Sequence, residues 1–204
     1  MHHGIYKGIA ADKSAKRILI LGESHHGKDE EKGIPALYTT QEVVETYLSE
    51  KVTKRNLEIF HKIAQSFGVD TTKEEEKLKF WDKVYFGNYV DEVCGIGTND
   101  AKYVIEKNKD TYNQELAEFV NREKIEYIFC FSVLVYKNLP NKYAEEEKVV
   151  AERKKRVFLR RGTYEPGDFF DHSVTVYGIP HPSAQGGFYP QDFVKEFEGF
   201  VNEA

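Results

Sequence analysis

The chain has 204 residues, of which 40% are hydrophobic and 31% are charged, and its formal net charge at pH 7 is −5. This is the composition of an ordinary globular protein with one sizeable core, and we expect a single domain over residues 1–204. A membrane-spanning helix is excluded because no run of about 18 apolar residues occurs. The start of the chain lacks the apolar core of a secretory signal, so we expect a cytoplasmic protein without membrane contact. We also expect a monomer.

The two cysteines, Cys94 and Cys130, are too few for a disulfide scaffold or for a four-thiolate iron–sulfur cluster. Cys130 lies in an apolar run, where a thiol behaves as a small core side chain. The sequence indicates no cofactor.

The first strand signal is the apolar run Ile18–Leu21, which is typical of a strand buried on both faces in a parallel sheet. Gly22 is expected to make a sharp turn at the end of this strand. Ligands bind beyond the carboxyl ends of such strands, and the polar residues expected there are Glu23, Ser24, His25 and His26. The alternative is a loop whose polar residues cap the next helix.

Helical spacing follows between residues 40 and 81. Thr40 is expected to cap a helix over 41–51, a second helix over 55–67 is expected to end at Gly68, and a third follows Asp70. The aromatic segment that comes next predicts a short strand with Asn88 at its carboxyl end. The alternative is a turn asparagine in left-handed geometry.

The second half of the chain continues this alternation. One amphipathic helix or a pair of helices is expected over 98–124, followed by the central strand over 125–135. A charged helix-like segment is expected over 141–155, strands over 156–161 and 172–177, and a final helix over 191–202. These elements predict a single three-layer α/β/α domain with a mostly parallel central sheet of about four strands.

The loop after the last strand holds His181 between Pro180 and Pro182, with Ser183 next. Prolines on both sides restrict the backbone around the imidazole, which favours a functional histidine.

A local basic segment, residues 153–161, contrasts with the negative net charge of the whole chain. Lys155, Arg156 and Arg160 are candidates for contacts with nucleic-acid phosphates. The alternative is a solvated charged surface.

Three motifs in this order resemble the uracil-DNA glycosylase superfamily. They are the segment Gly22–His26, the segment from Trp81 to Asn88, and His181-Pro182-Ser183 followed by Gly187-Phe188. The resemblance covers roughly residues 17–201 and implies the α/β/α fold of that superfamily. It also implies a DNA glycosylase that flips a damaged, uracil-type base out of the duplex and hydrolyses its N-glycosidic bond.

The resemblance implies a role for each motif. Asn88 would read the Watson–Crick edge of the base, and Phe86 would stack on it, with Tyr38 and Tyr89 as further candidates. His181 would stabilise the negative charge that develops on the base as the bond breaks. The base pocket would include Gly22 and His26, and the loop that reaches the DNA would include Pro182, Ser183, Gly186 and Gly187.

The first motif departs from the pattern of the superfamily. Ser24 occupies the position of the water-activating Asp or Asn, Glu23 lies where a subset of the superfamily also has glutamate, and His25 replaces a proline. The catalytic candidates of this motif are therefore Glu23, Ser24 and His25. The alternative is a member that binds nucleic acid or a nucleotide with altered or no activity.

Two other readings of the same residues remain. The stretch Gly22–Gly27 also resembles the Gly-Glu-x-x-His-Gly segment of erythromycin-esterase-like hydrolases, in which a histidine activates water and a glutamate orients it. A metal site would need Glu23, His25, His26 and His181 as ligands. Adjacent histidines point in different directions and no helical HxxxH spacing occurs, so no metal is expected.

Overall fold

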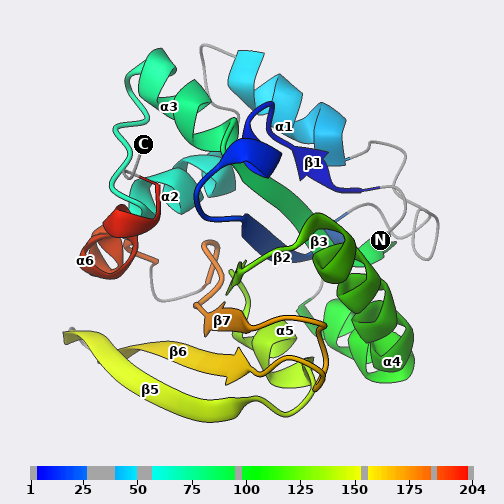
Figure 1. Ribbon diagram of the computed structural model, residues 1–204. Helices are drawn as coiled ribbons and strands as arrows, with labels where there is room; N and C mark the ends of the chain where they lie inside the picture. The colour runs from blue at the N-terminus through cyan, green and yellow to red at the C-terminus, as the bar shows by residue number, and fades with distance from the viewer. Residues whose placement is uncertain are drawn as a thin grey trace.

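The computed structural model describes residues 4–26, 40–49, 57–94, 98–152, 156–184 and 188–201 (Figure 1). Its centre is a seven-stranded sheet with the strand order β1-β3-β2-β4-β7-β6-β5. The strands are β1 (Tyr6–Lys7), β2 (Ile18–His26), β3 (Val84–Cys94), β4 (Tyr127–Cys130), β5 (Tyr143–Glu152), β6 (Arg156–Tyr164) and β7 (Val174–Gly178).

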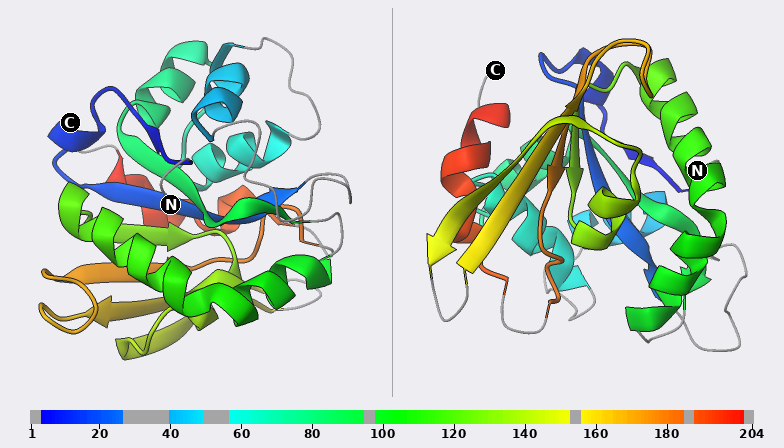
Figure 2. Two further views of the ribbon diagram at one scale, coloured as in Figure 1. Left: turned by 90° about the vertical axis from the view of Figure 1, so that its right-hand side faces the viewer. Right: turned by 90° about the horizontal axis from the view of Figure 1, so that it is seen from below.

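The described helices cover both faces of this sheet (Figure 2). They are α1 (Thr40–Ser49), α2 (Glu58–Ser66), α3 (Glu74–Trp81), α4 (Thr98–Glu123), α5 (Val133–Asn138) and α6 (Val194–Phe197), with short 3-10 turns η1 (Ala11–Lys13), η4 (Pro190–Asp192) and η5 (Glu198–Phe200). None of these described helices combines the length and the apolar character that a membrane crossing needs.

The predicted α/β architecture is confirmed, but the predicted number of strands is wrong. Four parallel strands, β3, β2, β4 and β7, form the centre. Three further strands add antiparallel pairing: β1 beside β3 at one edge, and β6 and β5 beyond β7 at the other.

The largest error concerns residues 141–155, which contain the strand β5 instead of a helix. Its glutamates face arginines of β6 in register: Glu146 lies opposite Arg161 and Glu147 opposite Arg160. Both pairs form ion pairs, at 3.1 Å and 2.5 Å. Cross-strand charge pairs stabilise a strand whose own sequence is charged, and a pattern within one segment does not reveal them. The predicted strand at 156–161 is confirmed by β6.

Other bounds differ in ways that have local causes. β4 ends at Cys130 because Ser132 caps α5, its hydroxyl accepting the Val135 N–H at 3.3 Å. The final predicted helix is divided into η4, α6 and η5. Gly68 ends α2 as expected, with a left-handed φ of 81°.

Two apolar cores lie on opposite faces of the sheet, because alternate residues of a strand point in opposite directions. Leu19 and Leu21 of β2 pack with α4 and α5, whereas Ile18 and Ile20 pack with α1, α2, α3 and α6. The second core is rich in aromatic rings around the fully buried Trp81.

The segments that follow neighbouring parallel strands lie on opposite faces of the sheet. The described elements after β2 and β7 belong to the layer of α1 and α6, and those after β3 and β4, which are α4 and α5, belong to the other layer. In open α/β sheets, divergence of this kind at the carboxyl ends of strands is where ligands bind.

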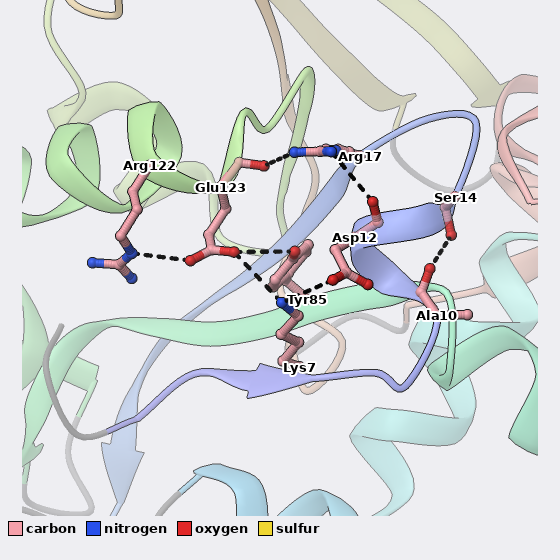
Figure 3. Close-up of polar contacts among 8 residues, drawn as sticks. All are labelled: Lys7, Ala10, Asp12, Ser14, Arg17, Tyr85, Arg122 and Glu123. Atoms are coloured by element: carbon pink, nitrogen blue, oxygen red, sulfur yellow. Dashed lines mark hydrogen bonds and ion pairs between the residues drawn. The ribbon is translucent and has the colours of Figure 1, made fainter.

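A network of charged and polar side chains connects the amino-terminal ends of these strands, which lie opposite their carboxyl ends (Figure 3). Glu123 at the end of α4 accepts hydrogen bonds from Tyr85 Oη at 3.3 Å and from Arg122 Nε at 2.9 Å, and it lies 3.7 Å from Lys7 Nζ. Arg17 donates to the Glu123 carbonyl at 2.8 Å. The network therefore joins β1, β2, β3 and α4 away from the carboxyl ends.

The network predicts a pH dependence of stability. Partial burial raises the pKa of the Glu123 carboxyl, but the hydrogen bond from Arg122 and the charge of Lys7 outweigh it, so the pKa is below its ordinary value. A depressed folded-state pKa means that the carboxylate stabilises the fold above about pH 4.3 and loses this effect as the pH falls. Glu123→Gln should give a shallower fall of the unfolding free energy between about pH 5 and pH 3.

Urea titrations at a series of pH values measure this slope. The exposed carboxylate of Glu118 lies on the same helix, and Glu118→Gln serves as the matched control, with the slope of the unsubstituted chain. Parallel curves for Glu123→Gln and the unsubstituted chain would contradict the assignment. The difference at neutral pH should be below about 1 kcal/mol, as is usual for a partly exposed network.

A second prediction concerns packing at the end of β7. A Cβ added at Gly178 would lie 2.5 Å from Cγ of the buried Tyr136 ring. Gly178→Ala should therefore lower the unfolding free energy by about 1–3 kcal/mol through overpacking. Gly199→Ala is the control because open space surrounds that position. Equal chemical denaturation curves for the two variants would show that the ring has room to move.

Candidate functional site

The register of the parallel strands brings the sequence motifs to one edge of the sheet. Gly87, Leu21, Cys130 and Gly178 lie side by side in one row across β3, β2, β4 and β7. The ladder continues past this row, because Phe131 N–H donates to the Leu21 carbonyl and Ile179 N–H donates to the Cys130 carbonyl, both at 2.9 Å. Just beyond the row come Asn88, Gly22 with Glu23, Ser132, and His181.

Gly22 lies inside β2, so the predicted sharp turn is wrong. Asn88 also lies inside its strand instead of at the predicted carboxyl end. The two residues are partners in the β2–β3 ladder, and a Cβ on Gly22 would lie 2.3 Å from Asn88 Oδ1. The glycine is therefore needed for close approach: the amide of Asn88 lies over bare backbone.

His25 holds this amide from the other side. The Nδ2 atom of Asn88 lies 3.2 Å from Nε2 of His25. Strict strand alternation would place His25 and Gly22 on opposite faces, but the β2–β3 register shifts between Ser24 and His25. Such an irregularity re-aims a side chain, and here it accounts for the contact between His25 and Asn88.

Glu23 is partly buried and, because alternate residues of β2 face opposite ways, it points with Leu21 to the α5 face of the sheet and not to the face of Gly22 and Asn88. Its Oε2 accepts a hydrogen bond of 2.5 Å from the hydroxyl of Ser132, at the start of α5. Ser24 is buried, and its Oγ has no hydrogen-bond partner among the described residues. Most buried polar groups in folded proteins have a hydrogen-bond partner, so Ser24 is unusual in this respect.

His181 lies in a tight turn that fixes its ring. Its Nδ1 accepts the backbone N–H of Ser183 at 3.2 Å and lies 2.7 Å from the Ser183 hydroxyl, and the His181 carbonyl accepts Ala184 N–H at 2.8 Å. Because a backbone N–H is always a donor, Nδ1 is the acceptor, and the neutral ring carries its proton on Nε2.

Two residues of this region were not found from the sequence. Lys62 of α2 donates to the Pro182 carbonyl at 3.3 Å and so ties the turn of His181 to the helical layer. Ser132 contacts Glu23 across 109 positions of the chain. Neither has a sequence signal, because a helical lysine and a strand-end serine are ordinary residues until the fold supplies their partners.

The candidate stacking rings have different positions. Phe86 is 4% exposed and packs on Phe60 and Trp81, with its Cζ 3.6 Å from the Cβ position of Gly22. Tyr89 is fully buried in the α4 layer, where its hydroxyl donates to Asn113 at 2.9 Å. Tyr38 lies outside the described residues. Phe86 is thus the ring that lies beside Gly22 and Asn88.

The basic segment is balanced by acidic partners. Arg160 pairs with Glu147, and Arg156 lies 3.5 Å from Glu152. Arg160 also lines a groove of about 600 Å³ between α5 and the β5–β6 ribbon, and Glu23, Asn88 and His181 are not among its lining residues. Lys155, Gly186, Gly187 and the side chain of His26 lie outside the described residues.

The candidate metal ligands and the two cysteines have the following surroundings. Within the described ranges, no three His, Cys, Asp or Glu side chains gather as metal ligands. Cys94 and Cys130 are buried free thiols, and burial raises the pKa of Cys130 to about 12, so it is a core residue as expected and not a thiolate nucleophile.

No protein-family model matches the chain, and a search of curated proteins finds no match. The geometry of the strand ends is therefore the basis for assigning a function.

The close approach at Gly22 can be tested without an activity. Gly22→Ala should displace the Asn88 amide and break its contact with His25, because the amide and the new methyl group cannot occupy the same space. The loss of stability should be smaller than for Gly178→Ala, since a terminal amide rotates away more easily than a buried ring. Side-chain ¹⁵N resonances of Asn88 and His25 report the contact, and unchanged resonances would show that it survives.

Proposed function

We propose that the chain is a DNA glycosylase-like hydrolase that cleaves the N-glycosidic bond of a flipped, uracil-type base. The supporting observation is the amide of Asn88, which lies over Gly22 beside the ring of Phe86 and contacts His25. An amide presents an acceptor and a donor side by side, which complements the Watson–Crick edge of a pyrimidine. The absence of a side chain at Gly22 leaves room for this amide.

His181 supplies the second element of the proposal. Its Nδ1 is an acceptor in the turn, so its Nε2–H is the donor. A fixed N–H donor stabilises the negative charge that develops on a base oxygen as the glycosidic bond breaks. The turn holds the ring before the reaction, so little reorganisation is required.

Glu23 supplies the third element of the proposal. In the proposed step, water attacks the anomeric carbon, its proton passes to the Glu23 carboxylate, and the base departs as an anion next to His181. The carboxylate also stabilises the positive charge that develops on the sugar. In the proposal Ser24, whose buried Oγ has no partner among the described residues, binds the sugar.

DNA contacts belong to the proposal as well. Arg156 and Arg160 would each have to exchange a glutamate of β5 for a phosphate. With a net charge of −5, we expect weak binding of undamaged DNA that decreases further with salt.

The test is alkali-induced strand cleavage of oligonucleotides that carry uracil, hypoxanthine, xanthine or a mismatched thymine. The chain should cleave at one of these bases, and His181→Ala should lower the rate by about 100- to 1,000-fold. His172→Gln is the matched control, because His172 lies just before β7, where its ring contacts the Ile125 carbonyl and Asp171. An unchanged rate in His181→Ala would exclude this role of His181.

The same assay tests the reading of the base. Asn88→Ala should lose discrimination among pyrimidines, since the polar atoms of the bound base would be left unpaired. Asn138→Ala is the control, because that side chain contacts only its own helix at the Leu134 carbonyl, as far as the described residues go. If base preference were unchanged in Asn88→Ala, another group would be the reader.

Ser24 favours one alternative function, a pocket that binds nucleic acid or a nucleotide without cleaving it. A hydroxyl does not by itself activate water at neutral pH. Binding of a uracil-containing oligonucleotide without base release, by folded protein, would establish this alternative. An esterase-like pairing of Glu23 with His25 is less well supported, because Glu23 contacts Ser132 and His25 contacts Asn88.

A further inference from the structure

Ser132 lies at the junction of β4 and α5 and is 1% exposed. The preceding residue, Phe131, donates its N–H to the Leu21 carbonyl at 2.9 Å, which joins the end of β4 to β2 just before Gly22. The distance between Ser132 and Glu23 is therefore set by backbone pairing and not by the side chains alone.

The direction of the Ser132 hydroxyl follows from its two contacts. Its Oγ accepts the N–H of Val135 at 3.3 Å, as the N-cap of α5, and lies 2.5 Å from Glu23 Oε2. A hydroxyl has one proton, and an N–H cannot accept it, so the proton points to the Glu23 carboxylate. The helix cap and the hydrogen bond to Glu23 are thus made by the same oxygen.

A glutamate side chain has three rotatable bonds and, when only partly buried, several available rotamers. A hydrogen bond to Oε2 fixes one carboxylate oxygen, and with it the plane in which Oε1 lies. Oε1 is then the atom that can accept a proton from a bound water. A misplacement of about 1 Å in such a group can cost about 100-fold in rate.

We propose that Ser132 is a positioning residue, which orients Glu23 for attack of water on the glycosidic bond. This inference rests on the proposed function. During the step, the water proton passes to Glu23 Oε1 and the base leaves as an anion, while the Ser132 proton stays on Oγ. Ser132 therefore affects the orientation of the Glu23 carboxylate and not the proton balance of the step.

The variant Ser132→Gly separates positioning from helix capping. Glycine is almost as good an N-cap as serine, with a loss of only a few tenths of a kcal/mol, but it has no hydroxyl to donate. In single-turnover assays on the base that the chain releases, the rate should fall about 10- to 100-fold, while the Kd for the same oligonucleotide stays within about twofold. Ser132→Thr keeps the hydroxyl and should restore most of the rate.

A double-substitution cycle keeps the test sharp if threonine does not fit the buried site. In a Glu23→Gln background, Ser132→Gly should have little further effect on the rate, because Ser132 acts through the carboxylate. Independent, multiplicative losses would overturn the proposal, and so would a Ser132→Gly enzyme as fast as the unsubstituted one.

The two failures can be told apart. If the unsubstituted chain releases no base from any oligonucleotide, the proposed function fails and this role of Ser132 fails with it. If the unsubstituted chain is active and Ser132→Gly is equally active, only the role of Ser132 is overturned.

Discussion

The site depends on the register of four parallel strands. Leu19 and Leu21 belong to one core and Ile18 and Ile20 to the other, so a shift of β2 by one residue would exchange the two faces and expose both sets to the wrong layer. The same register sets Gly22 beside Asn88 and Leu21 beside Cys130. Burial of ordinary aliphatic side chains thus determines where the polar groups of the strand ends lie, without any direct contact between the cores and those groups.

Glycines of this sheet leave room for neighbouring side chains, as Gly22 and Gly178 show. At Gly22 the space of a side chain is taken by the Asn88 amide, and at Gly178 it is taken by the Tyr136 ring. The first arrangement presents a polar group at the candidate site, and the second locks α5 onto β7. Since Ser132 caps the same helix and contacts Glu23, the packing of Tyr136 also helps to fix the position of the Glu23 carboxylate.

The sequence predicts the layers, the two buried strands β2 and β4, and the helices α1 to α4, because each depends on a periodic apolar pattern within one segment. It does not predict β1 or β5, which depend on pairing with another strand. The candidate residues Glu23, Asn88 and His181 were found from motif order, and they do lie at one end of the parallel strands. Ser132 and Lys62 were out of reach, because their contacts join distant segments of the chain. His25 was a predicted candidate, but its contact with Asn88 could not be predicted, since it follows from an irregular register.

The paired charges of the β5–β6 ribbon have a consequence for the edges of the sheet. The described sheet ends in β1 on one side and β5 on the other, and an outermost strand offers unpaired backbone groups that can template the addition of another chain. β1 is only two residues long, and β5 carries glutamates along its exposed length. The short length of β1 and the charges of β5 each disfavour pairing of that edge strand with another chain. Replacing those glutamates with apolar residues would make β5 an aggregation-prone edge strand, even in a chain whose interior is unchanged.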